Sequence, residues 1–290
     1  MFQGSMVALV TPFKEGKVDE KKLGELVDFH IKNGTDIIVP CGTTGESATL
    51  SFEEHERVVE VVIDKAKGKV SVIAGTGSNN TVEALKLTRH AKEAGADGAL
   101  VITPYYNKPT QRGMYLHFEK IAKEVDIPIV LYNVPGRTSV NLLPETVAKL
   151  AKIKNIVGIK EASGDLKQAS DIVGLCGDKF DLISGDDFIT LPMLALGGKG
   201  VISVVANLVP AEMAALIDEF NKGNLEKTKE IHYKIFPLCK AMFIETNPGP
   251  VKTAMALQGL LDTPELRLPL APMSKENVEK LKKVLMDFYS

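Results

Sequence analysis

A lysine at the end of a buried apolar run is the clearest candidate for chemistry in this sequence. Residues 156–163 read IVGIKEAS, so Lys160 follows β-branched residues and is followed by Glu161 and small polar residues. Burial disfavours the ammonium form of a lysine, and a neutral amine can form a Schiff base with a carbonyl substrate. A lysine that closes a strand is more often a solvated cap, so this interpretation needs support from the rest of the chain.

Two further motifs carry side chains suited to a carboxylic acid. In CGTTGES, at 41–47, two glycines let the backbone approach a ligand, and Thr43 and Thr44 supply hydroxyl and amide donors for a carboxylate. YNVPGRT, which begins at Tyr132, supplies a tyrosine that can relay a proton and, in Arg137, a planar guanidinium that matches a carboxylate. Each motif alone is also consistent with an ordinary turn.

The motif TPYYNKPT at 103–110 contains two adjacent tyrosines, Tyr105 and Tyr106. They can be site residues or form an aromatic contact at an interface. The stretch GTGSNN at 75–80 superficially resembles a phosphate-binding loop, but Asn80 stands where the third glycine of the dinucleotide motif belongs, and no Gly-Lys-Ser/Thr ends the loop. We therefore expect no nucleotide site.

Metal binding is not expected either. Asp186 and Asp187 follow Gly185 and could bind a metal, but aspartates before a helix more often cap it, and we expect caps here. The five histidines lie within helical patterns and lack the spacing of metal ligands. We expect most of them to have surface or packing roles.

Apolar, β-rich runs alternate with amphipathic stretches along most of the chain. Eight strands are expected, at 6–10, 37–39, 70–74, 98–102, 129–132, 156–159, 181–184 and 200–203. Helices are expected between them, including those at 20–33, 52–67, 81–94 and 111–125, and Ser51 and Glu54 predict a capping box at the second. Parallel strands joined by helices, eight in a chain of this length, predict a closed (β/α)8 barrel.

A doubly wound open sheet is the alternative fold. The barrel is favoured because only a closed ring brings residues that follow many different strands to one face, where barrel active sites lie. These residues are Thr11, Thr43, Tyr105, Tyr132, Lys160, Gly185 and Ser203. After residue 223 the alternation stops, and helical stretches at 225–244, 251–261 and 274–288 predict a barrel domain, 1–223, followed by a C-terminal helical region, 224–290.

The composition is that of an ordinary globular protein. The 290 residues are 44% hydrophobic and 25% charged, with a mean hydropathy of +0.04 and a formal net charge of −2. Mixed charges and the absence of a basic cluster argue against nucleic acid and membranes as partners. The cysteines (Cys41, Cys176 and Cys239) form no CxxC pair and no disulfide framework, which favours the cytoplasm.

Taken together, GTTGES, YNVPGRT and IVGIKEAS, in this order and at these spacings, resemble the dihydrodipicolinate synthase and N-acetylneuraminate lyase family of pyruvate-dependent class I aldolases. The resemblance covers essentially the whole chain. It implies that Lys160 forms the Schiff base with pyruvate and that Tyr132 transfers protons. It also implies that Thr43 and, from a neighbouring subunit, Tyr106 act in catalysis with Tyr132. Thr44 is implied to bind the pyruvate carboxylate, and Gly185 and Ile202 to contribute backbone contacts.

Within the family, the sequence is more similar to the synthases than to the sugar-acid lyases. Arg137 matches the arginine that binds the carboxylate of aspartate semialdehyde, and Thr43 and Thr44 replace the Ser-Thr usual in lyases. The implied reaction condenses pyruvate with L-aspartate 4-semialdehyde in lysine (diaminopimelate) biosynthesis, with no metal or organic cofactor. The alternatives are a lyase for N-acetylneuraminate or a 2-keto-3-deoxy sugar acid, which shares Lys160 and Tyr132, and a non-catalytic carboxylate-binding barrel.

The resemblance also implies a homotetramer built from tight dimers, and inhibition by lysine between subunits. The residues that match the inhibitory site are Ser47, Ala48, His55, Asn79, Glu83 and Tyr105. Phe52 is a departure, because some regulated members carry histidine there.

Overall fold

The protein is described by a computed structural model of residues 1–290. Its centre is a closed barrel of parallel strands in the order β1-β10-β9-β8-β7-β6-β5-β4. The strands are β1 (Gly4–Ala8), β4 (Ile37–Val39), β5 (Ser71–Gly75), β6 (Gly98–Ile102), β7 (Ile129–Asn133), β8 (Ile156–Glu161), β9 (Asp181–Ser184) and β10 (Gly200–Ser203). The predicted (β/α)8 barrel is confirmed, and the open sheet is wrong, because β1 pairs with both β10 and β4 and leaves no edge.

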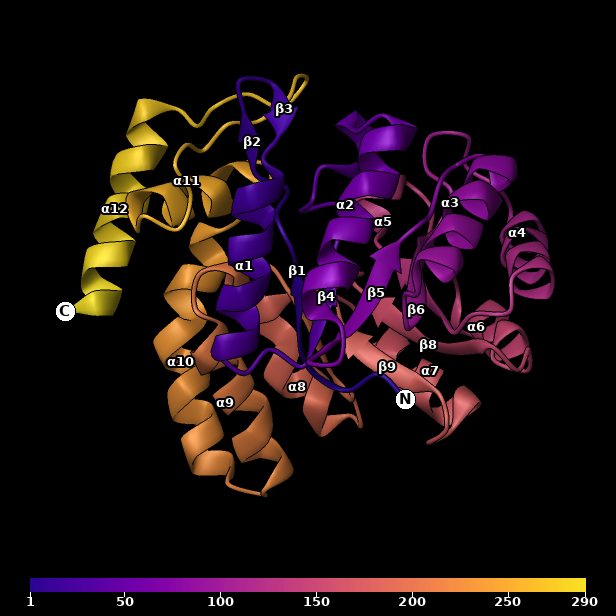
Figure 1. The fold of residues 1–290 in the computed structure, drawn as a ribbon. Helices are drawn as coiled ribbons and strands as arrows, with labels where there is room; N and C mark the ends of the chain where they lie inside the picture. The colour runs from indigo at the N-terminus through magenta and orange to yellow at the C-terminus, as the bar shows by residue number, and fades with distance from the viewer.

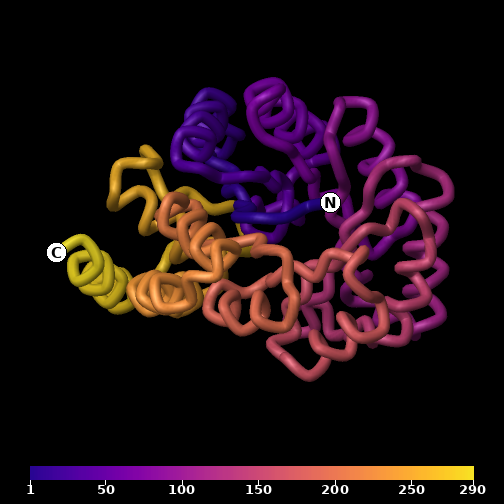
Figure 2. Tube along the Cα trace, turned by 90° about the horizontal axis from the view of Figure 1, so that it is seen from below, coloured from indigo at the N-terminus to yellow at the C-terminus, as the bar shows by residue number.

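Helices surround the strands as a ring (Figure 2). They are α1 (Glu20–Lys32), α2 (Phe52–Ala66), α3 (Thr81–Ala94), α4 (Gln111–Glu124), α5 (Pro135–Thr138), α6 (Pro144–Leu150), α7 (Leu166–Cys176), α8 (Thr190–Ala195), α9 (Pro210–Asn221), α10 (Leu225–Ala241), α11 (Gly249–Leu257) and α12 (Lys275–Tyr289). Short 3-10 helices are η1 (Ser47–Thr49), η2 (Asp187–Ile189) and η3 (Val205–Asn207). The capping box at α2 is confirmed, because Ser51 Oγ accepts from the Glu54 N–H and the Glu54 carboxylate accepts from the Ser51 N–H. No helix is long and apolar enough to cross a lipid bilayer.

The first strand lies two residues earlier than the predicted 6–10. After Ala8, the Leu9 N–H still donates to the Val39 carbonyl at 3.0 Å, but the Val10 N–H donates to the Asn207 side chain at 3.1 Å. The strand therefore ends at Ala8 although the sequence remains apolar, because the buried Asn207 side chain, and not a neighbouring strand, accepts from the Val10 N–H. The following hairpin, β2 (Phe13–Lys14) with β3 (Lys17–Val18), was also not predicted.

The barrel interior is a packed apolar core. Met6, Ile73, Val130, Ile183 and Ile202 have no exposed surface and belong to one cluster, which also includes the ring of Tyr132. Because side chains fill the interior, a ligand can approach only the ends of the barrel.

The C-terminal helices pack on the same side of the barrel as α1 and α9 (Figure 1). Helix α10 contacts α9 and α12, and α11 contacts α12 and η3. One hydrophobic cluster includes Leu26 of α1, Val62 of α2, Leu238 of α10, Met255 of α11 and Leu285 of α12. Residues 224–290 therefore share a continuous core with the barrel helices.

Candidate active site

Lys160 and Tyr132 occupy neighbouring positions on adjacent strands. The register pairs Tyr132 of β7 with Lys160 of β8, and Lys160 Nζ lies 4.4 Å from the centroid of the Tyr132 ring. Lys160 is 5% exposed and Tyr132 6% exposed. Because parallel strands in register direct paired side chains to the same face, the amine and the phenol approach one another at the C-terminal ends of their strands. A buried amine beside a phenol can form an imine and exchange protons.

Two acidic side chains lie near this amine, after β9. Burial raises the pKa of Asp186 to about 6, the Lys160 charge opposes the shift, and Asp187 and Glu161 add to it. Burial also raises the pKa of Asp187, whose Oδ2 accepts from the N–H groups of Val204 (3.0 Å) and Val205 (2.9 Å).

The predicted helix caps at these aspartates are wrong. Asp186 precedes η2 but its side chain accepts no capping hydrogen bond, and Asp187 lies within η2. The Asp187 carboxylate is instead directed at the backbone that follows β10, where N–H groups turning away from the barrel need an acceptor. Sequence spacing cannot distinguish this long-range role from a local cap.

Glu161 anchors the backbone immediately after Lys160. Its Oε1 accepts from the Ser163 N–H at 2.7 Å, and its Oε2 accepts from Asn133 (3.0 Å) and Gln168 (3.1 Å). Asn133 also donates to Asn141 at 2.8 Å. This buried network joins β7, β8 and α7 behind the candidate nucleophile, and the sequence interpretation assigned no role to its amides.

The CGTTGES turn follows β4, as predicted, and contacts a residue that the sequence interpretation missed. Thr44 is 2% exposed, and its Oγ1 accepts from Asn247 Nδ2 at 3.0 Å. The Asn247 carbonyl in turn accepts from Arg137 Nη2 at 3.4 Å. Asn247 therefore joins two predicted carboxylate-binding motifs, although in the sequence its TNPGP stretch suggests only a break between helices.

A cavity of about 480 Å³ lies beside this turn. Its lining brings together Thr43 and Arg137 with five of the six residues matched to the inhibitory site, namely Ser47, Ala48, His55, Glu83 and Tyr105. The sixth, Asn79, does not line the cavity, nor do Lys160 and Tyr132.

The remaining predicted site residues lie elsewhere. Tyr106 is 89% exposed and does not line the cavity. Ile202 is buried in the barrel core with Tyr132. The Gly185 N–H donates to the Glu161 carbonyl at 2.8 Å, which places Gly185 against the segment that follows Lys160. No group of three or more His, Cys, Asp or Glu side chains is arranged to hold a metal ion.

Comparison with known proteins identifies the family of this chain. A family model described as the dihydrodipicolinate synthetase family matches residues 1–287. The chain belongs to this family. The 4-hydroxy-tetrahydrodipicolinate synthase of Geotalea uraniireducens is 62% identical over 288 residues, covering 99% of both chains. The crystal structure of dihydrodipicolinate synthase from Aquifex aeolicus is 55% identical, with a TM-score of 0.98 over 99% of this chain and 98% of that one.

A more distant family member was solved with an amino acid bound. The enzyme of Cyanidioschyzon merolae, described as having lysine bound, is 42% identical with a TM-score of 0.96 and covers 99% of this chain and 98% of its own. Membership of the dihydrodipicolinate synthetase family thus agrees with the barrel fold and favours an enzyme over a non-catalytic barrel.

Proposed function

We propose that this protein condenses pyruvate with L-aspartate 4-semialdehyde to 4-hydroxy-tetrahydrodipicolinate, in lysine (diaminopimelate) biosynthesis. The observation that carries the proposal is the buried amine of Lys160, 4.4 Å from the centre of the Tyr132 ring. Relatives about 60% identical over nearly the whole chain are named for this activity.

In the proposed reaction, the Lys160 amine adds to the keto carbon of pyruvate, and loss of water leaves a protonated imine. The imine withdraws electrons, so a methyl proton is lost and an enamine forms. The enamine carbon attacks the aldehyde carbon of the semialdehyde. The amino group of the product then attacks the imine carbon and displaces Lys160 as the ring closes.

The other residues have proposed roles in this sequence. Tyr132, assisted by Thr43, moves protons to and from the reacting groups. Thr44 binds the pyruvate carboxylate, and Arg137 binds the carboxylate of the semialdehyde, because a guanidinium can donate two parallel hydrogen bonds. Gly185 and Ile202 contribute backbone contacts.

We further propose that Tyr106 acts in the site of a neighbouring subunit, within a homotetramer. The residue is 89% exposed on a single chain. Its φ is +71°, a backbone conformation that non-glycine residues seldom adopt. Sedimentation at assay concentration tests this assembly, and a fully active monomer would contradict the role of Tyr106.

Lysine is the proposed inhibitor at the cavity. Burial lowers the pKa of His55 to about 4, so its ring is neutral there, whereas the Glu83 carboxylate can pair with an ammonium group. Glu83 already accepts from Ser78 Oγ at 2.7 Å and Asn80 Nδ2 at 3.2 Å, which orients it. An unchanged rate at saturating lysine would contradict inhibition, and Glu83→Gln should weaken it without altering turnover in the absence of lysine.

We also place the protein in the cytoplasm, on the basis of three cysteines without disulfides. The division into a barrel, 1–223, and a helical region, 224–290, remains a proposal that separate expression of the first segment can test.

The deciding experiment follows pyruvate consumption on addition of aspartate semialdehyde. Lys160→Ala should abolish turnover. The control is Lys154→Ala, which removes an exposed lysine shortly before Lys160 in the chain and should leave turnover unchanged. Borohydride with pyruvate should label the wild type but not Lys160→Ala. If pyruvate labels Lys160 but the semialdehyde is not consumed, the acceptor is wrong and sugar aldehydes come next. If Lys160 is not labelled, the barrel binds carboxylates without this chemistry.

A further inference from the structure

Glu46 and Lys252 form an ion pair that is shielded from solvent. Lys252 Nζ lies 2.6 Å from Glu46 Oε1, and neither side chain has any exposed surface. Glu46 belongs to the CGTTGES turn, whereas Lys252 lies in α11, 206 residues further along the chain. Burial lowers the pKa of Lys252, and the charge of Glu46 opposes that shift. The ion pair connects the turn that carries Thr43 and Thr44 to the C-terminal helices.

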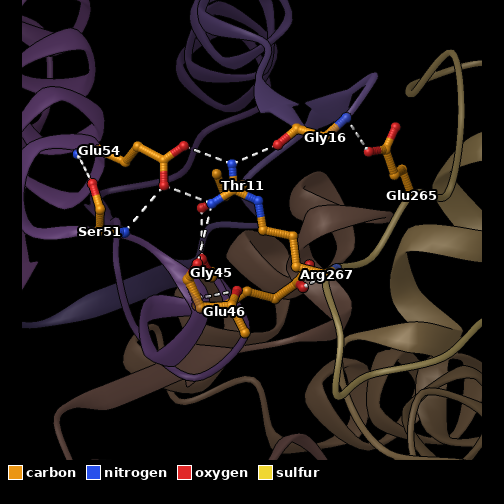
Figure 3. A network of polar contacts seen from close by, with 9 residues as sticks. Thr11, Gly16, Gly45, Glu46, Ser51, Glu54, Glu265 and Arg267 are labelled. Atoms are coloured by element: carbon orange, nitrogen blue, oxygen red, sulfur yellow. Dashed lines mark hydrogen bonds and ion pairs between the residues drawn. The ribbon is translucent and has the colours of Figure 1, made fainter.

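Arg267 also binds the CGTTGES turn and the start of α2 (Figure 3). Its backbone N–H donates to Glu46 Oε2 at 3.1 Å, and its guanidinium donates to both carboxylate oxygens of Glu54 at 2.6 Å. It also donates to the carbonyls of Thr49 (3.1 Å) and Gly16 (2.7 Å). The segment between the two glutamates is therefore held at both ends by one arginine.

The aromatic ring of Phe13 contacts both cations of this cluster. Lys252 Nζ lies 4.3 Å and Arg267 Cζ 4.4 Å from the centroid of the Phe13 ring. The negative face of an aromatic ring attracts a cation. Phe13 thus favours the placement of both basic groups around Glu46 and helps to exclude water from the pair.

The backbone of the turn needs this support. Cys41 and Glu46, on either side of the two threonines, have φ angles of +55° and +54°, and such conformations of non-glycine residues persist only where the surroundings impose them. The Thr11 hydroxyl adds one further contact by donating to the Gly45 carbonyl at 2.7 Å. A buried ion pair contributes little to stability compared with apolar packing, so its geometric effect is the more informative one.

We propose that Glu46 is a positioning residue, which Lys252 and Arg267 hold so that Thr43 and Thr44 keep the geometry required for binding pyruvate and transferring protons. This inference rests on the proposed function, since it assumes that the two threonines act on pyruvate. Both carboxylate oxygens of Glu46 already accept hydrogen bonds within the chain, from Lys252 and from the Arg267 N–H. The C-terminal region therefore has a part in forming the active site.

The test compares wild type with the double variant Glu46→Gln/Lys252→Met, in which both charges are removed together so that no buried charge is left unpaired. Borohydride trapping of pyruvate on Lys160 counts active sites, and kcat is expressed per trapped site. We expect a thermal midpoint near that of wild type, a kcat lowered about 10- to 100-fold, and a raised KM for pyruvate, because small misplacements of positioning groups have effects of this size. A purely structural role would lower the trapped fraction and leave kcat per site and KM unchanged.

The control is Glu212→Gln/Lys234→Met, which removes a 3.3 Å ion pair at the surface between α9 and α10, and it should leave all three quantities unchanged. If the buried double variant does not fold, Glu46→Gln takes its place, because the amide fills the same space, its oxygen can still accept from the Arg267 N–H, and burial already lowers the pKa of Lys252. Wild-type kcat per site and KM in the folded variant would overturn the proposal. Failure of the wild type itself to consume the semialdehyde would instead overturn the proposed function.

Discussion

Lys160 and Tyr132 are paired across β8 and β7, with the lysine nitrogen 4.4 Å from the centre of the tyrosine ring. The ring packs in the barrel core, and proton transfer is the role proposed for its hydroxyl. The packing of this tyrosine and its proposed proton transfer can therefore be separated by removing one oxygen atom.

Tyr132→Phe keeps the ring and removes the hydroxyl. We expect kcat to fall about 100-fold or more, as for the loss of a general acid–base group, with a thermal midpoint within a few degrees of wild type because the ring still fills the core. Steady-state kinetics and calorimetry measure the two effects. Tyr115→Phe, which loses a hydroxyl that donates to Glu119 at the surface, is the control. Undiminished turnover in Tyr132→Phe would exclude the hydroxyl from proton transfer.

Arg137→Ala tests the choice between the synthase and a sugar-acid lyase. The guanidinium is exposed toward the cavity, and only a 3.4 Å hydrogen bond to the Asn247 carbonyl holds it. Loss of a charged hydrogen-bonding partner should raise the KM for aspartate semialdehyde about 10- to 100-fold, while the rate of pyruvate trapping on Lys160 stays unchanged. Arg112→Ala, at an exposed position of α4, should alter neither. Equal losses in trapping and in turnover would contradict a role specific to the semialdehyde.

Gly185→Ala tests how closely the chain is packed behind the site. A Cβ atom at this position would lie 2.5 Å from Ala162 Cβ and 3.0 Å from the Glu161 carbonyl oxygen, so the segment after Lys160 must move. Overpacking of this kind destabilises a protein by about 1–3 kcal/mol, and we expect kcat to fall as well. In Gly174→Ala, a helical position with open space around it, stability should be equal or higher by up to about 1 kcal/mol. Chemical denaturation compares the two variants, and similar stabilities would mean that the Gly185 segment adjusts freely.

The sequence predicted the barrel well because the features that define it, apolar runs and turn motifs, are each contained in a short stretch of the chain. Apolar runs locate the strands, and the motifs place Tyr132 and Lys160 at the C-terminal ends of two strands and Thr43 in the turn that follows a third. The contacts that join these motifs are not local. Asn247 reaches Thr44 across 203 residues, and in sequence it is only an asparagine before a proline.

The aspartates after β9 also make contacts with a distant segment, and here the local pattern gave a wrong prediction. Their spacing before η2 is that of helix caps, yet Asp187 accepts from backbone N–H groups that follow β10. Which donor a carboxylate meets depends on how neighbouring strands are registered, and no single stretch of sequence contains that information. Charge and burial, and not spacing, set the properties of Asp186.

Asp186→Asn should make stability depend less on pH. Because the pKa of Asp186 is raised by burial to about 6 from an ordinary value near 3.8, the folded state binds more protons than the unfolded state between these pH values. The contribution of this carboxyl to stability is therefore greatest below pH 3.8 and is lost as the pH rises through about 6. A shift of this size corresponds to about 3 kcal/mol, which partial exposure reduces to about 1–2 kcal/mol.

The measurement is the free energy of unfolding from urea titrations between pH 4 and pH 8. Above pH 6, Asp186→Asn should be more stable than wild type by about 1–2 kcal/mol, since the neutral amide avoids the buried negative charge, and the difference should diminish toward pH 4. Asp287→Asn, at an exposed position in the last turn of α12, controls for the change in net charge. A difference between wild type and Asp186→Asn that stays constant across the range would mean that Asp186 ionises in the folded protein as it does in the unfolded chain.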